Sequence, residues 1–183
     1  AASLEKYDRI CRRLRLRPKD HVVEIGTGWG GFALHAASRY GCRVTTTTIS
    51  NEQYRFAAER IRRAGLSDRV TVEQKDYRAL QGAYDALVSM EIIEAVGHRF
   101  FDTYFEVCSR MLRDDGLMGL QAITVPDQRY DRYRRSVDFL QRYIFPGGLV
   151  PSVGVMNASI ARRTDMGMLK LEEIGRHYAD TLA

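Results

Sequence analysis

Short apolar runs alternate with longer amphipathic segments along this chain, at intervals of roughly 20 to 25 residues. The apolar runs predict strands over residues 21–25, 43–49, 69–74, 84–89, 117–125 and 168–174. The segments between them predict helices over residues 4–17, 32–40, 51–64, 100–112 and 127–143, and a further helix that begins at Pro151. This alternation is typical of an α/β fold, with a doubly wound, mainly parallel sheet and helices on both faces.

Cap and turn residues separate several of these elements. Ser50 is expected to cap helix 51–64, with Gln53 completing a capping box and Gly65 ending the helix. Residues 114–116, Asp-Asp-Gly, predict a turn before the fifth strand.

The chain contains no repeat, low-complexity stretch or linker, so residues 1–183 are interpreted as a single domain. A polar segment at about residues 126–150 interrupts the alternation after the fifth strand. Since open α/β sheets bind ligands at the carboxyl ends of their strands, we interpret this segment as an insertion on the ligand side.

Composition excludes several classes of protein. Of the 183 residues, 45% are hydrophobic and 28% charged, which excludes a disordered or collagen-like chain. No apolar stretch approaches the roughly 18 residues of a membrane span, and the first residues lack the apolar core of a signal peptide. Cys11, Cys42 and Cys108 are odd in number and far apart, which favours buried thiols in a reducing cytosol, and the histidines are too scattered for a metal site. The net charge of +5 leaves nucleic acid, a phospholipid surface and an acidic metabolite open as partners.

A glycine-rich loop, Gly26-Thr-Gly-Trp-Gly-Gly, follows the first predicted strand. Its spacing also satisfies Gly-x-Gly-x-x-Gly, which alone would allow NAD. A dinucleotide site usually has a carboxylate at the end of the second strand, but this chain has Thr47 and Thr48 there. Glu24, two places before the first glycine, suits a ligand with a cationic amino group better than a pyrophosphate.

The pattern Glu-x-Gly-x-Gly-x-Gly resembles the first motif of class I methyltransferases, which bind S-adenosylmethionine. Asp76 and Tyr77, at the end of the third strand, are consistent with that cofactor, offering a carboxylate for the adenine amine and a ring to cover its face.

Longer motifs make the resemblance more specific. The chain resembles the cyclopropane-fatty-acyl-phospholipid synthase family in motifs that follow the family's order over nearly its whole length. These motifs are residues 22–31, 48–53, 91–98, 120–124, 127–130, 143–152 and 177–182. Many family members have a histidine at the position of Gln121. With a glutamine there, the chain resembles the branch of the family that includes the plant-type synthases.

The resemblance implies methyl transfer from S-adenosylmethionine to the cis double bond of a phospholipid acyl chain. The alkene attacks the methyl group, a carbocation forms, and loss of a proton closes a cyclopropane ring. The cation must be sheltered from water, and a base must lie near the new methyl group. Family members hold a bicarbonate ion as that base. By position, its holders in this chain would be Glu94, Gln121, Ile123 through its backbone, and Tyr178.

The resemblance also implies a set of cofactor-binding residues. The glycines Gly26, Gly28 and Gly30 would hold the methionine part of S-adenosylmethionine. The ribose side would meet Thr48, Ile49, Ser50 and Gln53, the adenine would meet Asp76 and Tyr77, and Met90 would face the cofactor. Glu91 receives no firm role.

Simpler structural interpretations of the catalytic candidates remain open. Glu94 and His98 are four residues apart and are compatible with a pair on a helix surface. Gln121 is compatible with a satisfied core amide, and Tyr178 with an ordinary packing residue. The family also has an N-terminal segment and a last antiparallel strand that we expect to be absent here, so the chain is interpreted as the core of a longer enzyme.

The sequence is therefore compatible with three classes of function. The first is cyclopropane formation on a phospholipid, and the second is methylation of a small molecule or of a lipid without ring closure. The third is a non-catalytic binding module. Nucleic acid is not expected as a partner, because the Asn/Asp-Pro-Pro-aromatic motif is missing after the fourth strand.

The basic surplus is consistent with a lipid substrate. Arginines crowd helix 4–17 and the insertion, where aromatic residues lie between them. Such a mixture suits a phospholipid interface, although a solvated helix face remains the alternative. The expectation is a cytoplasmic protein peripheral to the membrane, for which a homodimer stays open.

Overall fold

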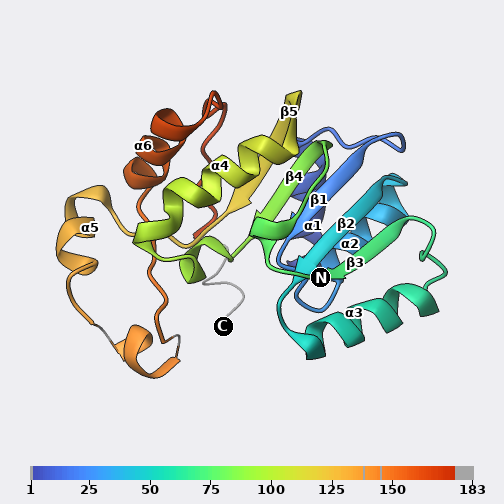
Figure 1. Ribbon diagram of the computed structural model, residues 1–183, viewed down its shortest axis with the longest axis horizontal. Coiled ribbons are helices and arrows are strands. Elements are labelled where there is room, and N and C mark those ends of the chain that lie inside the picture. Colours follow the sequence, from blue (N-terminus) through green and yellow to red (C-terminus); the bar gives the residue numbers. More distant parts are fainter. Residues whose placement is uncertain (1, 138, 145, 176–183) are drawn as a thin grey trace.

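The computed structural model describes residues 2–137, 139–144 and 146–175. Within them, five parallel strands form one sheet in the order β3-β2-β1-β4-β5 (Figure 1). The strands are β1 (His21–Ile25), β2 (Arg43–Thr48), β3 (Val70–Gln74), β4 (Tyr84–Met90) and β5 (Leu112–Gln121). The predicted doubly wound α/β fold is thereby confirmed.

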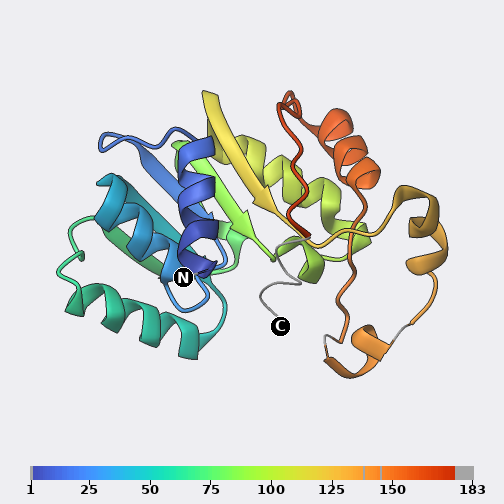
Figure 2. The same ribbon diagram turned by 180° about the vertical axis from the view of Figure 1, so that it is seen from behind.

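The helices cover both faces of the sheet. They are α1 (Ala2–Arg13), α2 (Gly31–His35), α3 (Asn51–Arg63), α4 (Phe101–Met111), α5 (Asp127–Tyr133) and α6 (Val153–Arg163). Two π-helical turns, Ala36–Tyr40 and Leu140–Ile144, and three 3₁₀ turns, Tyr77–Ala79, Ile93–Ala95 and His98–Phe100, complete the regular structure. Figure 1 shows α4 in front of the sheet, and the reverse view in Figure 2 shows α1 and α2 on the opposite face.

Successive strand residues alternate between two hydrophobic cores. Val22 packs with Phe32 of α2 and Cys11 of α1, whereas Val23 packs with Tyr104 and Phe105 of α4. Because both faces of a parallel sheet are buried, the inner strands have no side that faces the solvent, and in β1 all residues from Val22 to Ile25 are buried. The three cysteines are buried and free, as expected.

The predicted capping box is present in a modified form. The Ser50 hydroxyl accepts from the Gln53 backbone N–H at 3.3 Å, as predicted. The Gln53 side-chain oxygen, however, accepts from the Thr48 hydroxyl at 2.8 Å, and the Ser50 N–H donates to that hydroxyl at 3.1 Å. Thr48 therefore joins the cap and links the end of β2 to the first turn of α3.

The prediction for the fifth strand was partly wrong. Residues 114–116 lie inside β5 instead of forming a turn before it, and the strand ends at Gln121, short of residue 125. Its register against β4 jumps from the pair Tyr84–Leu112 to the pair Ala86–Leu117, so the surplus residues bulge out of the ladder. The Arg113 side chain pairs with Asp85 at 2.8 Å and ties the bulge to β4.

Two later predictions were also wrong. Residues 127–143 do not form one helix, because α5 ends at Tyr133 and buries only Tyr130, too narrow an apolar face to support a long helix. Residues 168–174 form no strand. Leu169 in this segment is 83% exposed, and Glu172 instead forms ion pairs with Arg9 and Arg13 of α1, at 3.5 Å and 3.1 Å.

Among the described residues, no helix has the length and apolar character needed to cross a membrane. The segment from α5 to the turn Leu140–Ile144 extends away from the sheet (Figures 1 and 2). It leaves β5 at the carboxyl end and returns at Pro151, whose carbonyl accepts from the Val125 N–H at 3.0 Å. The segment therefore begins and ends near the carboxyl end of β5.

Candidate functional site

The glycine loop turns sharply between β1 and α2. Gly26, Gly28 and Gly30 have φ values of 93°, 51° and 75°, a region that favours glycine. A Cβ on Gly26 would lie 2.3 Å from the Ile92 side chain, whereas a Cβ on Gly28 would meet nothing within 4 Å. Gly26 therefore permits close internal packing, and Gly28 leaves its backbone open to a ligand.

Glu24 is buried in the sheet just before this loop. It lies beside Thr46 of β2 and Val88 of β4 and is only 2% exposed. Burial raises the pKa of its carboxyl to about 8, and a hydrogen bond with Thr46 opposes that shift in part. Its Oε2 atom has no hydrogen-bond partner among the described residues. A buried acceptor next to an open glycine backbone fits a ligand that carries a hydrogen-bond donor.

The predicted ribose residues gather where β2 ends. Thr48, Ser50 and Gln53 are linked by the hydrogen bonds of the α3 cap, and Ile49 beside them is 78% exposed. An exposed aliphatic side chain next to the glycine loop is available to cover a flat ligand.

The predicted adenine residues follow β3. Both Asp76 carboxylate oxygens accept from the Arg78 guanidinium, at 2.9 Å and 2.6 Å, and this contact lowers the pKa of Asp76. The Tyr77 ring packs edge-on against Tyr104, with 5.5 Å between centroids. Asp76 is thus held ionised, but a ligand must share it with Arg78.

The catalytic candidates from β4 and β5 meet at the carboxyl edge of the sheet. Glu94 Oε1 accepts from the Ile123 backbone N–H at 2.6 Å, and the Glu94 carbonyl accepts from the Leu149 N–H at 2.7 Å. Partial burial, with a smaller contribution from the Glu91 charge, raises the pKa of Glu94, although the hydrogen bond from Ile123 opposes the rise. The segment after β5 therefore holds the Glu94 carboxyl group, and the inserted segment holds its backbone.

Gln121 belongs to the same group of residues. Its amide nitrogen donates to Glu91 Oε1 at 2.9 Å, and that oxygen also contacts Lys6 Nζ at 3.1 Å. Met90 lies opposite Gln121 in the β4–β5 register. Sequence reasoning missed Lys6 and left Glu91 without a role, since nothing local in the sequence joins residues 85 positions apart.

The structure decides between some of the simpler interpretations. Glu94 and His98 do not share a helix, because residues 93–100 form two separate short turns. The His98 ring nitrogen Nδ1 instead forms a hydrogen bond with the Tyr130 hydroxyl at 2.8 Å. Tyr178 lies outside the described residues. Among the described residues, no group of His, Cys, Asp or Glu is arranged to hold a metal ion.

Comparison with known proteins identifies the family. The family described as mycolic acid cyclopropane synthetase matches residues 1–183. Tuberculostearic acid methyltransferase UfaA1 of Mycobacterium tuberculosis is 39% identical over 182 residues, which are 100% of this chain and 42% of that protein. Cyclopropane-fatty-acyl-phospholipid synthase of Escherichia coli K12 is 40% identical over 154 residues, which are 84% of this chain and 38% of that protein.

A solved structure agrees with the sequence comparison. Mycolic acid cyclopropane synthase CmaA1, in a crystal structure with SAH and CTAB, superposes with a TM-score of 0.88 at 26% identity and covers 98% of this chain and 66% of that one. The fold is thus the Rossmann-like fold of class I methyltransferases. The chain belongs to the mycolic acid cyclopropane synthetase family, and it spans about two fifths of the length of the two curated relatives.

Proposed function

We propose that this chain is the core of an S-adenosylmethionine-dependent methyltransferase that forms a cyclopropane ring on an unsaturated phospholipid acyl chain. The observation that carries the proposal is the convergence of Glu94, Gln121 and Ile123 at the carboxyl edge of β4 and β5. This edge also bears the glycine loop, so an electrophilic cofactor and a proton-handling group would lie side by side.

The residues present fit S-adenosylmethionine. The open backbone at Gly28 and the unpartnered Glu24 Oε2 would receive the amino-acid part, and Gly26 and Gly30 would shape the loop around it. The ribose side would lie near Thr48, Ile49, Ser50 and Gln53, the adenine near Asp76 and Tyr77, and the sulfonium near Met90. When bound, the cofactor supplies an electrophilic methyl group.

This chain's own residues would handle the proton. Glu94 is half-buried, and its raised pKa suits a group that accepts a proton in a partly dry site. A bicarbonate ion at this site would be held by Glu94, Gln121 and Tyr178. The Ile123 N–H already donates to Glu94, so Ile123 would act on the ion through Glu94.

Fatty-acid analysis of a bacterial host that lacks cyclopropane lipids tests the proposal. The complete natural protein is expected to yield acyl chains that are one methylene heavier and resist hydrogenation. The Glu94→Gln variant should yield none at equal expression. A methyl-branched product, or no lipid product with wild-type protein, contradicts cyclopropane formation.

A second candidate is methyl transfer to a lipid without ring closure. The name of UfaA1, tuberculostearic acid methyltransferase, favours it. The same lipid extract separates the two reactions, because a branched product is read directly by mass spectrometry. Methylation of a small molecule would leave the lipids unchanged but still consume the cofactor, and a non-catalytic module would bind the cofactor without consuming it.

The inserted segment supports a phospholipid surface as the partner. Phe139 and Tyr143 are both exposed, with 5.1 Å between ring centroids, and the Arg142 guanidinium lies 5.4 Å from the Tyr143 ring. Arginines beside exposed rings suit the boundary between head groups and acyl chains. We therefore place the protein at the cytoplasmic side of a membrane, bound peripherally.

A further inference from the structure

Helix α1 brings a lysine to the candidate site from far away in the sequence. Lys6 Nζ lies 3.1 Å from Glu91 Oε1, and the Gln121 amide nitrogen donates to the same oxygen at 2.9 Å. One carboxylate oxygen thus joins α1, the end of β4 and the end of β5. Neither Lys6 nor Glu91 was among the residues expected to bind or react.

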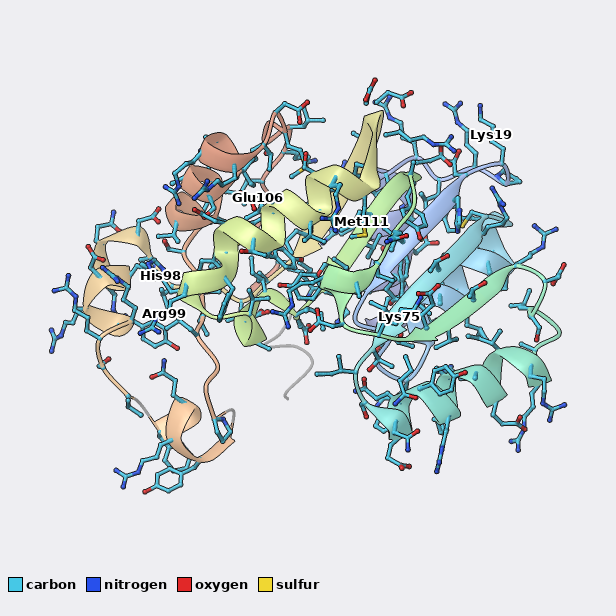
Figure 3. The ribbon with its side chains drawn as sticks, viewed as in Figure 1. Lys19, Lys75, His98, Arg99, Glu106 and Met111 are labelled. Atoms are coloured by element: carbon cyan, nitrogen blue, oxygen red, sulfur yellow. The ribbon has the colours of Figure 1, made fainter. Side chains whose placement is uncertain are left out.

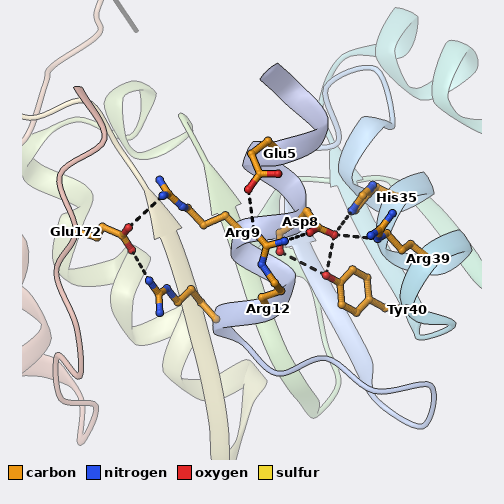
Figure 4. Close-up of polar contacts among 9 residues, drawn as sticks. Glu5, Asp8, Arg9, Arg12, His35, Arg39, Tyr40 and Glu172 are labelled. Atoms are coloured by element: carbon orange, nitrogen blue, oxygen red, sulfur yellow. Dashed lines mark hydrogen bonds and ion pairs between the residues drawn. The ribbon is translucent and has the colours of Figure 1, made fainter. Parts of the chain in front are cut away.

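The position of α1 is fixed by a buried carboxylate. Asp8 accepts from the Tyr40 hydroxyl at 2.8 Å, and its Oδ1 lies 3.2 Å from His35 Nε2 and 3.1 Å from Arg39 Nε (Figure 4). Tyr7 packs so closely on the glycine loop that a Cβ on Gly31 would lie 2.6 Å from its hydroxyl. These contacts hold the backbone of α1 beside the glycine loop and so keep Lys6 within reach of Glu91.

The Glu91 backbone adds a second link to Gln121. Glu91 has a φ of 58°, a left-handed conformation that a residue with a side chain rarely adopts. In that conformation its N–H donates to the Gln121 carbonyl at 2.9 Å, while its side chain bonds the Gln121 amide. Strained backbone of this kind persists where the surroundings determine it, and such positions cluster at functional sites.

The chemistry of the three groups sets the orientation of Gln121. An ionised carboxylate only accepts hydrogen bonds, so Glu91 selects the NH₂ end of the amide and turns the carbonyl end away. Lys6 places a positive charge beside the same carboxylate oxygen. We propose that Lys6 and Glu91 are positioning residues that hold the Gln121 amide in one orientation for the reaction. This inference rests on the proposed function.

The test uses the complete natural protein with the single variants Lys6→Met and Glu91→Gln and the double variant. Lys6→Arg keeps the charge, and Lys19→Met removes an exposed lysine that precedes β1, at the opposite edge of the sheet (Figure 3). Each variant is measured for its melting temperature, its SAH affinity by calorimetry and its single-turnover transfer of labelled methyl to unsaturated phospholipid vesicles.

Lys6→Met and Glu91→Gln are expected to slow transfer about tenfold or more, with SAH affinity and melting temperature near those of the wild type. Lys6→Arg should recover part of the rate, and Lys19→Met should have no effect. The double variant should be no slower than the slower single variant, since the residues act as one unit. The inference is overturned if both single variants transfer methyl groups at the wild-type rate. It is also overturned if the rate loss of the double variant equals the product of the two single losses. A wild-type protein that binds SAH but transfers no methyl group to lipid contradicts the proposed function itself, and the inference falls with it.

Discussion

Glu94 and Ile123 join the ends of two neighbouring strands through one short hydrogen bond, 2.6 Å from the Ile123 N–H to Glu94 Oε1. The bond fixes the carboxyl group of Glu94 relative to β5, and it opposes the rise in pKa that partial burial causes. The net direction is still upward, so the proton affinity of Glu94 exceeds that of an ordinary glutamate.

Glu94→Gln is expected to lower kcat at least about 100-fold, the usual range for loss of a positioned acid–base group. The amide keeps an oxygen that accepts from Ile123 but cannot take up a proton. Because the pKa of Glu94 is raised above 4.5, wild-type kcat should increase with pH through that raised value, and the variant should lack this acid limb. The measurement is a pH–rate profile of methyl transfer.

Glu106→Gln is the control for that variant, since Glu106 is an exposed carboxylate on α4 (Figure 3). It should match the wild-type rate and profile. An unchanged rate or an unchanged acid limb in Glu94→Gln removes Glu94 from the proposed chemistry.

Gly28→Ala and Gly65→Ala form a matched pair for testing the cofactor loop. Both glycines have positive φ, 51° and 69°, and at both an added Cβ meets nothing within 4 Å. Each substitution should therefore destabilise the fold by a similar amount, about 1 kcal/mol, from backbone strain alone. Only Gly28→Ala should weaken SAH binding by calorimetry, because only that Cβ would enter the proposed cofactor site. Equal SAH affinity in the two variants contradicts the placement of the cofactor on the loop.

Local patterns in the sequence predicted the elements whose ends are marked by neighbouring residues. The apolar run of β1 stops at Gly26, and the bounds of that strand were predicted without error. The segment 168–174 shows where such patterns fail. Its apolar residues match a strand, but in the structure the segment lies beside α1, where Glu172 forms ion pairs. A strand needs a partner, and the sequence pattern does not say whether one is in place.

The candidate site likewise combines residues that local motifs predict with residues that only the packing of the chain brings together. Glu94, Gln121 and Ile123 were predicted through motifs, and the order of β4 and β5 brings these residues to one edge of the sheet. Lys6 and Glu91 depend on the packing of α1 against the sheet, a contact between distant positions that no periodicity encodes. The Arg78 contact with Asp76 was equally invisible, because side-chain direction after a strand depends on the turn that follows.

Glu24 should make the stability of the protein without bound cofactor depend on pH. Its carboxyl pKa is raised from 4.5 to about 8 in the folded chain. The folded state then binds the proton more tightly than the unfolded state, so the stability that Glu24 contributes is fully present below pH 4.5 and lost as pH rises toward about 8. Glu24→Gln, which stays neutral, should match the wild-type melting temperature below pH 4.5 and exceed it increasingly up to about pH 8. If the melting temperatures of Glu24→Gln and of the wild type differ by the same amount at every pH in this range, Glu24 is not a buried, neutral group.

Phe139 and Tyr143 should anchor the inserted segment to anionic membranes. Their exposed rings contact each other beside Arg142, and α5 carries further arginines. Phe139→Ser with Tyr143→Ser is expected to weaken co-sedimentation with phosphatidylglycerol-containing vesicles about tenfold, because two rings no longer bury at the interface. Leu169→Ser is the control, since Leu169 is even more exposed, at 83% against 66% for Phe139 and 62% for Tyr143, but lies outside the insertion. Binding of the wild type should also decrease at high salt, as expected for arginines that contact lipid head groups. An equal loss in Leu169→Ser, or full binding by the double variant, assigns the membrane contact to another part of the protein.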